Sequence, residues 1–147
     1  MKTILVPVDF SDVTPHVVNV ARSMAAAFDC QIAILHVIEP EPDFVGFEPG
    51  PSSARLSVAQ DFKTERKQLE ELKDRLLAEG REVISIATQG ASADTILHEA
   101  QKHDAEWIVM GSHGHGALYE LLVGSVTHGV MKKSRCPVVV VPSRTQL

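Results

Sequence analysis

The stretch Trp107-Ile-Val-Met110 is apolar; Gly111-Ser-His-Gly114 follows at once and Gly124-Ser125 nine residues later. An apolar run that breaks into glycines predicts a buried strand ending in a tight turn. Beyond Gly124, apolar side chains recur at helical spacing, at Val126, Val130 and Met131. A helix that begins beside such a turn offers free N–H groups and the positive end of its dipole to a phosphate. The stretch therefore predicts a phosphate site, with glycines that merely turn the chain as the alternative.

Along the whole chain, short apolar runs alternate with longer amphipathic segments. Rich in valine, isoleucine and leucine, these runs are typical of strands buried on both faces of a parallel sheet. The predicted strands are residues 3–8, 31–38, 82–88, 107–111 and 137–141. This alternation with helices predicts an α/β, doubly wound fold in a single domain, residues 1–147.

Three further segments have the spacing of helices packed on a sheet. The first begins at Thr14-Pro15, as N-cap and first-turn residue, and places Val17, Ala21, Met24 and Phe28 on one face. The second covers about residues 53–79 and ends at Gly80, a favourable residue just beyond a helix. The third covers residues 92–103.

Composition excludes several classes of protein. The chain has 147 residues, is 44% hydrophobic and 22% charged, and carries a net charge of −5. An acidic chain is a poor candidate for non-specific nucleic-acid binding, and no apolar run approaches the ~20 residues of a membrane span. The N-terminal sequence is unlike a signal peptide, so we expect a cytoplasmic protein. Cys30 and Cys136 are too few for a disulfide framework and are expected to be free thiols rather than a redox pair.

The motif Gly111-x2-Gly114-x9-Gly124-Ser125 matches, at every fixed position, the nucleotide motif of the ATP-binding branch of the universal stress protein family. Residues 4–11 are similar to that family's first strand, residues 35–37 to its second, and residues 136–142 to its last. The chain thus resembles the family along its full length and in the same order. The resemblance implies a three-layer sandwich around a five-stranded parallel sheet of order 3-2-1-4-5 (adenine nucleotide alpha hydrolase-like).

In that strand order, the chain builds toward one edge of the sheet after strand one and toward the other edge after strand four. Ligands bind beyond the carboxyl ends of the two strands at which the order reverses in this way. The resemblance implies that Asp9 and the backbone at Val37 contact adenine and ribose, with Pro7 and Val8 as apolar walls; a turn-capping role for Asp9 is the alternative. Ser125 is implied to contact phosphate, with helix capping as the alternative. The implied nucleotide-binding residues are Pro7, Val8, Asp9, Val37, Met110, Gly111, His113, Gly114, His115, Gly124, Ser125 and Val126.

The phosphate end departs from the family at two positions. His115 stands where the family often has Arg or Lys, and Gly116 where Thr or Asn is more usual. A histidine is mostly neutral at pH 7, so His115 supplies less positive charge to a phosphate than Arg or Lys does. His113 and His115 do not suffice for a metal site, and none is predicted. The motif holds no acid for Mg²⁺ and no lysine or arginine, so catalytic residues are not predicted either.

The resemblance implies an ATP-binding regulator of the stress response, with or without Mg²⁺, and leaves AMP and ADP open as ligands. A slow ATPase or adenylate-handling enzyme, and a structural dimer with a vestigial site, are the alternatives. A homodimer is expected through strand 137–141, an apolar edge. Residues 39–53, with Phe44 and Phe47, are interpreted as a lid over the adenine or as an irregular connection.

Overall fold

The computed structural model describes residues 1–39, 52–113 and 123–143, of which residues 52–61 are described by their backbone alone. Its elements are β1 (Lys2–Pro7), α1 (Thr14–Phe28), β2 (Cys30–Ile38), α2 (Ser52–Ala78), β3 (Val83–Gln89), α3 (Ser92–Lys102), β4 (Ala105–Gly111), α4 (Ser125–Lys133) and β5 (Val138–Val141). The strands form one sheet of order β3-β2-β1-β4-β5. Every pair of neighbouring strands is parallel, which confirms the predicted fold and strand order.

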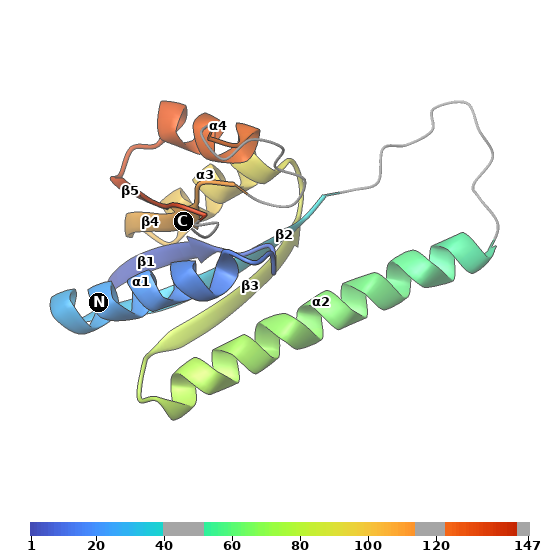
Figure 1. Ribbon diagram of the computed structural model, residues 1–147, viewed down its shortest axis with the longest axis horizontal. Coiled ribbons are helices and arrows are strands. Elements are labelled where there is room, and N and C mark those ends of the chain that lie inside the picture. The colour runs from blue at the N-terminus through green and yellow to red at the C-terminus, as the bar shows by residue number, and fades with distance from the viewer. Residues whose placement is uncertain (40–51, 114–122, 144–147) are drawn as a thin grey trace.

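The sheet separates two apolar cores. Helices α1 and α2 cover one face, and α3 and α4 cover the other (Figure 1). Side chains alternate between these faces along each strand: Val6 and Ile34 point to the α1/α2 core, whereas Leu5 and Leu35 point to the α3/α4 core. Burial on both faces explains why the strands are almost continuously apolar.

Helix α2 is held to the sheet by its C-terminal half. Leu69, Leu72 and Leu76 are buried there in the α1/α2 core. The N-terminal turns of α2 extend past the end of the sheet (Figure 1). The helix ends as predicted, because Gly80 follows it with a φ of 85°, a conformation that glycine adopts without strain.

Some element ends differ from the sequence predictions. The N-cap of α1 is Val13 rather than Thr14, which is already helical. Phe28, predicted on the buried face of α1, is 52% exposed and stacks on Trp107 with their ring centroids 4.9 Å apart. In α4, Val130 is fully buried but Met131 is 50% exposed. Strand β4 begins two residues early, at Ala105, because Ala105 pairs with Thr3 of β1.

The two cysteines lie on strands far apart in the sheet. Cys30 begins β2 and Cys136 precedes β5, with β1 and β4 between these strands. Three strand spacings amount to ~14 Å, whereas a disulfide needs Cα atoms within about 7 Å. Both thiols are free, and Cys30 is buried.

We expect Cys30 to be much less reactive than Cys136 in the native protein. Burial raises the pKa of the Cys30 thiol, and the carboxylates of Glu106 and Asp29 raise it further against the opposing effect of Lys2. A raised pKa lowers the thiolate fraction at any given pH, and the thiolate is the reactive form. Timed alkylation at pH 8 followed by mass spectrometry should label Cys136 faster than the buried Cys30. In urea the two rates should converge; equal native rates, or an intramolecular Cys30–Cys136 bridge in oxidised protein, would contradict the fold.

Within the described ranges, no helix combines the length and apolar character that crossing a membrane requires.

Candidate functional site

The candidate site lies where the order of the strands reverses, between β1 and β4. β1 and β4 are neighbours at the centre of the sheet, and the chain after β1 leads to α1 on one face, whereas α4 covers the other face (Figure 1). The ends of the two strands approach closely: a Cβ placed on Gly111, the last residue of β4, would lie 2.7 Å from Cγ1 of Val13. Glycine is therefore required here for space, since the turn after β1 packs against this strand end.

Ser112 joins three elements at this edge of the sheet. Its N–H donates to the Val141 carbonyl of β5 at 2.8 Å, and its own carbonyl accepts the N–H of Gly124 at 2.8 Å. Its hydroxyl accepts the N–H of Ser143 at 3.1 Å and lies 3.1 Å from Nδ1 of His113. The hydroxyl of Thr127 in α4 donates to the Gly111 carbonyl at 2.8 Å. These bonds fix the start of α4 against the end of β4.

Among the residues that the structure describes, no side chain caps the first turn of α4. Its N-cap residue is Gly124, and the structure shows no side-chain hydrogen bond to the cap. Ser125 is the first helical residue and is exposed, so the capping interpretation of Ser125 is wrong. The helix N-terminus thus presents backbone N–H groups and a positive dipole end beside the β4 strand end, which is the arrangement that suits an anion.

The end of β1 forms the other half of the site. The carboxylate of Asp9 accepts the N–H of Ser11 through Oδ1 at 3.0 Å, so the turn-forming role considered for Asp9 is present. Phe10 between them has a φ of 59°, in the left-handed region. Among the described residues, the buried Oγ of Ser11 and Nε2 of His113 have no hydrogen-bond partner. Buried polar atoms are rarely left so, and both atoms belong to the strand ends that define the site.

The predicted residues fall into groups in the structure. Val37, Met110 and Val126 face the α3/α4 core together. Val8 does not join them, because its side chain is buried in the α1/α2 core, and its role as an apolar wall of the nucleoside pocket stays a prediction. Gly114 and His115 lie outside the described residues, as does Gly116, and so does the segment 40–51 with Phe44 and Phe47. In the described ranges, no three His, Cys, Asp or Glu side chains are grouped to hold a metal ion.

Ser112 and Thr127 were not predicted as site residues. Ser112 occupies a variable position of the glycine motif, and its partner Val141 is remote in sequence. Thr127 is buried, although a threonine in the first turn of a helix is ordinarily exposed. Ser112 lies inside the glycine motif, and Thr127 directly follows Val126. These positions are the signals by which the sequence could have identified the two residues.

Replacing Gly111 with alanine should destabilise the fold mainly through a clash with Val13, since the new Cβ would lie 2.7 Å from its Cγ1 atom and 3.2 Å from the His113 carbonyl oxygen. Overpacking of a buried site costs about 1–3 kcal/mol, and the clash here is with Val13. In the double variant Gly111→Ala/Val13→Ala, the loss in the free energy of unfolding should be smaller than the sum of the two single losses by about 1 kcal/mol. Urea unfolding measures all three; strictly additive losses would show that the two residues do not compete for space.

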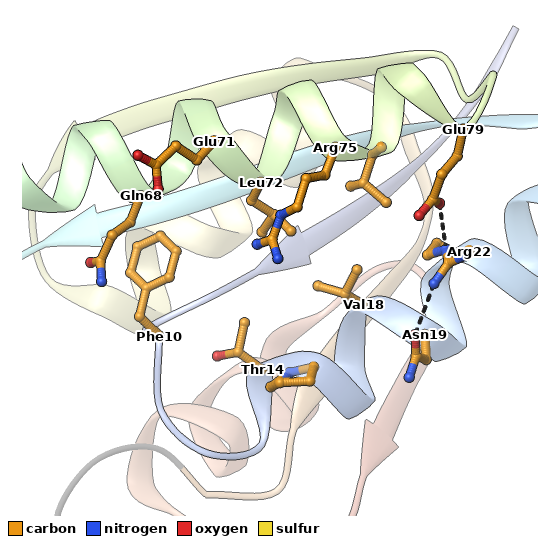
Figure 2. Close-up of a pocket in the computed structure, with 12 residues that line it drawn as sticks. Phe10, Thr14, Val18, Asn19, Arg22, Gln68, Glu71, Leu72, Arg75 and Glu79 are labelled. Carbon is orange, nitrogen blue, oxygen red and sulfur yellow. Dashed lines mark hydrogen bonds and ion pairs between the residues drawn. The ribbon is translucent and has the colours of Figure 1, made fainter.

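A separate groove of ≈ 340 Å³ lies between α1 and α2. Figure 2 shows Phe10 at one end and, at the other, Arg22 paired with Glu79 at 2.8 Å. Val18 and Leu72 point into it between these ends. The groove lies on the opposite face of the sheet from Val37, Met110 and Val126, so we do not assign it to the candidate site.

A five-stranded parallel sheet whose strand order reverses between β1 and β4, with the start of α4 held beside the end of β4, defines a doubly wound α/β protein. The sequence profile of the universal stress protein family matches residues 1–142. The chain therefore belongs to the universal stress protein family.

Individual relatives agree with this assignment. A universal stress protein of Thermus aquaticus is 34% identical, with 95% of this chain and 98% of the relative covered. Universal stress protein MJ0531 of Methanocaldococcus jannaschii is 32% identical, with 95% and 81% covered. The solved structure of MJ0577, also of Methanocaldococcus jannaschii, superposes with a TM-score of 0.81 at 29% identity and covers 99% of this chain and 98% of that chain.

Proposed function

We propose that this universal stress protein binds an adenine nucleotide at the carboxyl ends of β1 and β4 and acts as a nucleotide-responsive regulator. The observation that carries the proposal is the hydrogen bond from the Gly124 N–H to the Ser112 carbonyl. It holds the start of α4, which no described side chain caps, beside the end of β4. A phosphate placed there would meet the N–H groups of Ser125 and Val126. The adenosine end of the ligand would lie toward Asp9, Val37 and Met110.

Structural neighbours support the choice of an adenine nucleotide. One universal stress protein was solved in complex with cAMP, and one from Archaeoglobus fulgidus in complex with dAMP. They share the fold of this chain, with a TM-score of 0.68 each, at 24% and 22% identity. The match to the Gly-x2-Gly-x9-Gly-Ser motif extends the proposal to ATP, with Gly114 and His115 as further phosphate contacts.

We propose binding rather than turnover as the main activity. Phosphoryl transfer requires carboxylates that hold a metal and cations on the transferred group, and the motif supplies neither. The positive charges of α4 are Lys132 and Lys133 in its last turn, at the opposite end from the proposed phosphate site.

Native mass spectrometry of freshly purified protein tests this function. We expect a bound mass equal to AMP, ADP or ATP, and calorimetry should then give saturable binding of the same nucleotide to stripped protein. An hour of incubation with radiolabelled ATP should return mostly intact ATP. Protein that carries no nucleotide and binds none in calorimetry would contradict the proposal, and rapid release of phosphate would favour the enzyme alternative.

We also propose a homodimer through β5. This strand is at the edge of the sheet, pairs only with β4 among the described strands, and consists of Val138–Val141. Exposed apolar edges aggregate unless they are paired or covered, and a two-fold pairing of two identical edges leaves neither one free.

A further inference from the structure

His36 is a buried polar side chain that contacts the residues directly after β1. It lies in β2 and is 6% exposed. Its Nδ1 atom is 2.9 Å from the carbonyl oxygen of Val8, and its Nε2 atom is 3.0 Å from Oε2 of Glu65 in α2. The ring of Phe10 packs against it with centroids 5.1 Å apart. Three segments therefore meet on one imidazole.

Both ring nitrogens of His36 have an oxygen partner. A backbone carbonyl only accepts hydrogen bonds, so Nδ1 of His36 carries the hydrogen that is donated to Val8. Glu65 holds the ring from the other side, at Nε2, through a carboxyl group whose side chain is 37% exposed. The ring therefore links α2 to the end of β1.

The Val8 backbone is held by β2 through both of its polar groups. Its N–H donates to the Leu35 carbonyl at 2.8 Å, and its carbonyl accepts the hydrogen bond from His36. The next residues form the turn in which Asp9 accepts the Ser11 N–H and Phe10 is left-handed. This is the turn that the proposed function places beside the nucleoside, so a group that fixes Val8 also fixes the carboxylate of Asp9.

We propose that His36 is a positioning residue for the nucleoside end of the site: its ring, held by Glu65 at Nε2, donates through Nδ1 to the Val8 carbonyl and so orients the Asp9 turn. The proposal rests on the proposed function only for the identity of the ligand. It does not place His36 in contact with that ligand, because the ring lies on the α1/α2 side of the sheet, with Phe10 and α2 around it.

An isosteric pair of variants separates positioning from packing. In His36→Asn the side-chain amide nitrogen can take the place of Nδ1 and donate to Val8, whereas His36→Leu has nearly the same shape and no donor. With adenosine as the probe, we expect the Asn variant to bind within about twofold of wild type. The Leu variant should bind about tenfold more weakly, because the buried Val8 carbonyl loses its partner. Glu71→Gln, an exposed change in α2, should have no effect.

A long-range ¹H–¹⁵N spectrum reports directly which ring nitrogen carries hydrogen. Nδ1 of His36 should be protonated in the wild type, because its partner, the Val8 carbonyl, can only accept a hydrogen bond. In Glu65→Gln the side-chain amide can still bind Nε2, so Nδ1 should stay protonated and adenosine affinity should stay within about twofold. An Nδ1 without hydrogen in the wild type would overturn the hydrogen bond on which the positioning role depends.

Equal adenosine affinity in folded Asn and Leu variants would overturn the positioning role. Failure of the wild type to bind adenosine would instead count against the proposed function. The positioning role would still be decided by hydrogen exchange at the Ser11 amide, which should be at least fivefold faster in the Leu variant than in the Asn variant and unchanged if His36 does not order the turn.

Discussion

Replacing Ser125 with aspartate is expected to weaken ATP binding about thirtyfold while the protein stays folded. Ser125 is exposed and begins α4, where a carboxylate favours the helix because it faces the positive end of the dipole. The same carboxylate would occupy the place proposed for phosphate. Two like charges 4 Å apart repel by about 4 kcal/mol near a protein surface, and half of that after screening corresponds to roughly thirtyfold in affinity.

The aspartate variant has a matched neutral control in Ser125→Asn. Calorimetry with ATP and with adenosine should show a large loss for ATP in the aspartate variant only. Adenosine affinity should be unchanged in both variants, and thermal unfolding of the aspartate variant should be equal to the wild type or slightly higher. ATP affinity that survives the aspartate would place the phosphates away from α4.

Lysine at Val139 or Val140 is expected to convert the proposed dimer to monomer. Successive side chains of β5 point to opposite faces, so one of the two substitutions places its charge toward the partner whichever face is shared. A two-fold axis brings the two new charges into one interface, where each must also lose water. We expect dimerisation to weaken at least a hundredfold, or about 2.7 kcal/mol.

Light scattering at micromolar concentration measures this change, with thermal unfolding to verify the fold. Thr88→Lys is the control, because it adds the same charge to β3 at the opposite edge of the sheet. If both β5 variants remain dimeric, the interface lies elsewhere. A wild-type protein that is monomeric at this concentration would remove the proposal altogether.

Most of the fold could be predicted from the sequence, because strands buried on both faces appear as uninterrupted apolar runs. Less could be predicted about where elements end. Ala105 belongs to β4 because it pairs with Thr3 of β1, and the neighbouring Glu106 forms an ion pair with Lys2 of β1 at 3.1 Å. No apolar pattern reveals such pairings. Phe28 has helical spacing with Val17 and Ala21, but it lies at the last turn of α1, where Trp107 covers one side of its ring and water the other.

The candidate site was predictable where it depends on backbone shape and unpredictable where it depends on partners. Gly111 stands out in the sequence because a glycine directly after an apolar run indicates a strand end. The role of Ser112 depends on carbonyl and N–H groups of β5 and α4, which only the folded chain brings together. The face that Val8 occupies follows from the alternation in β1, which an apolar run with no polar interruptions conceals.

The bonds of Ser112 have a consequence for how a signal could leave this protein. Its carbonyl receives the first N–H of the α4 start, and its N–H is bound to the last residue of β5. The proposed ligand and the proposed second subunit thus act on two sides of one residue. If the nucleotide and the second subunit both favour the same placement of Ser112, each raises the affinity for the other by the same free energy. Self-association would then be the output that reads the nucleotide level, and no moving domain would be needed to transmit it.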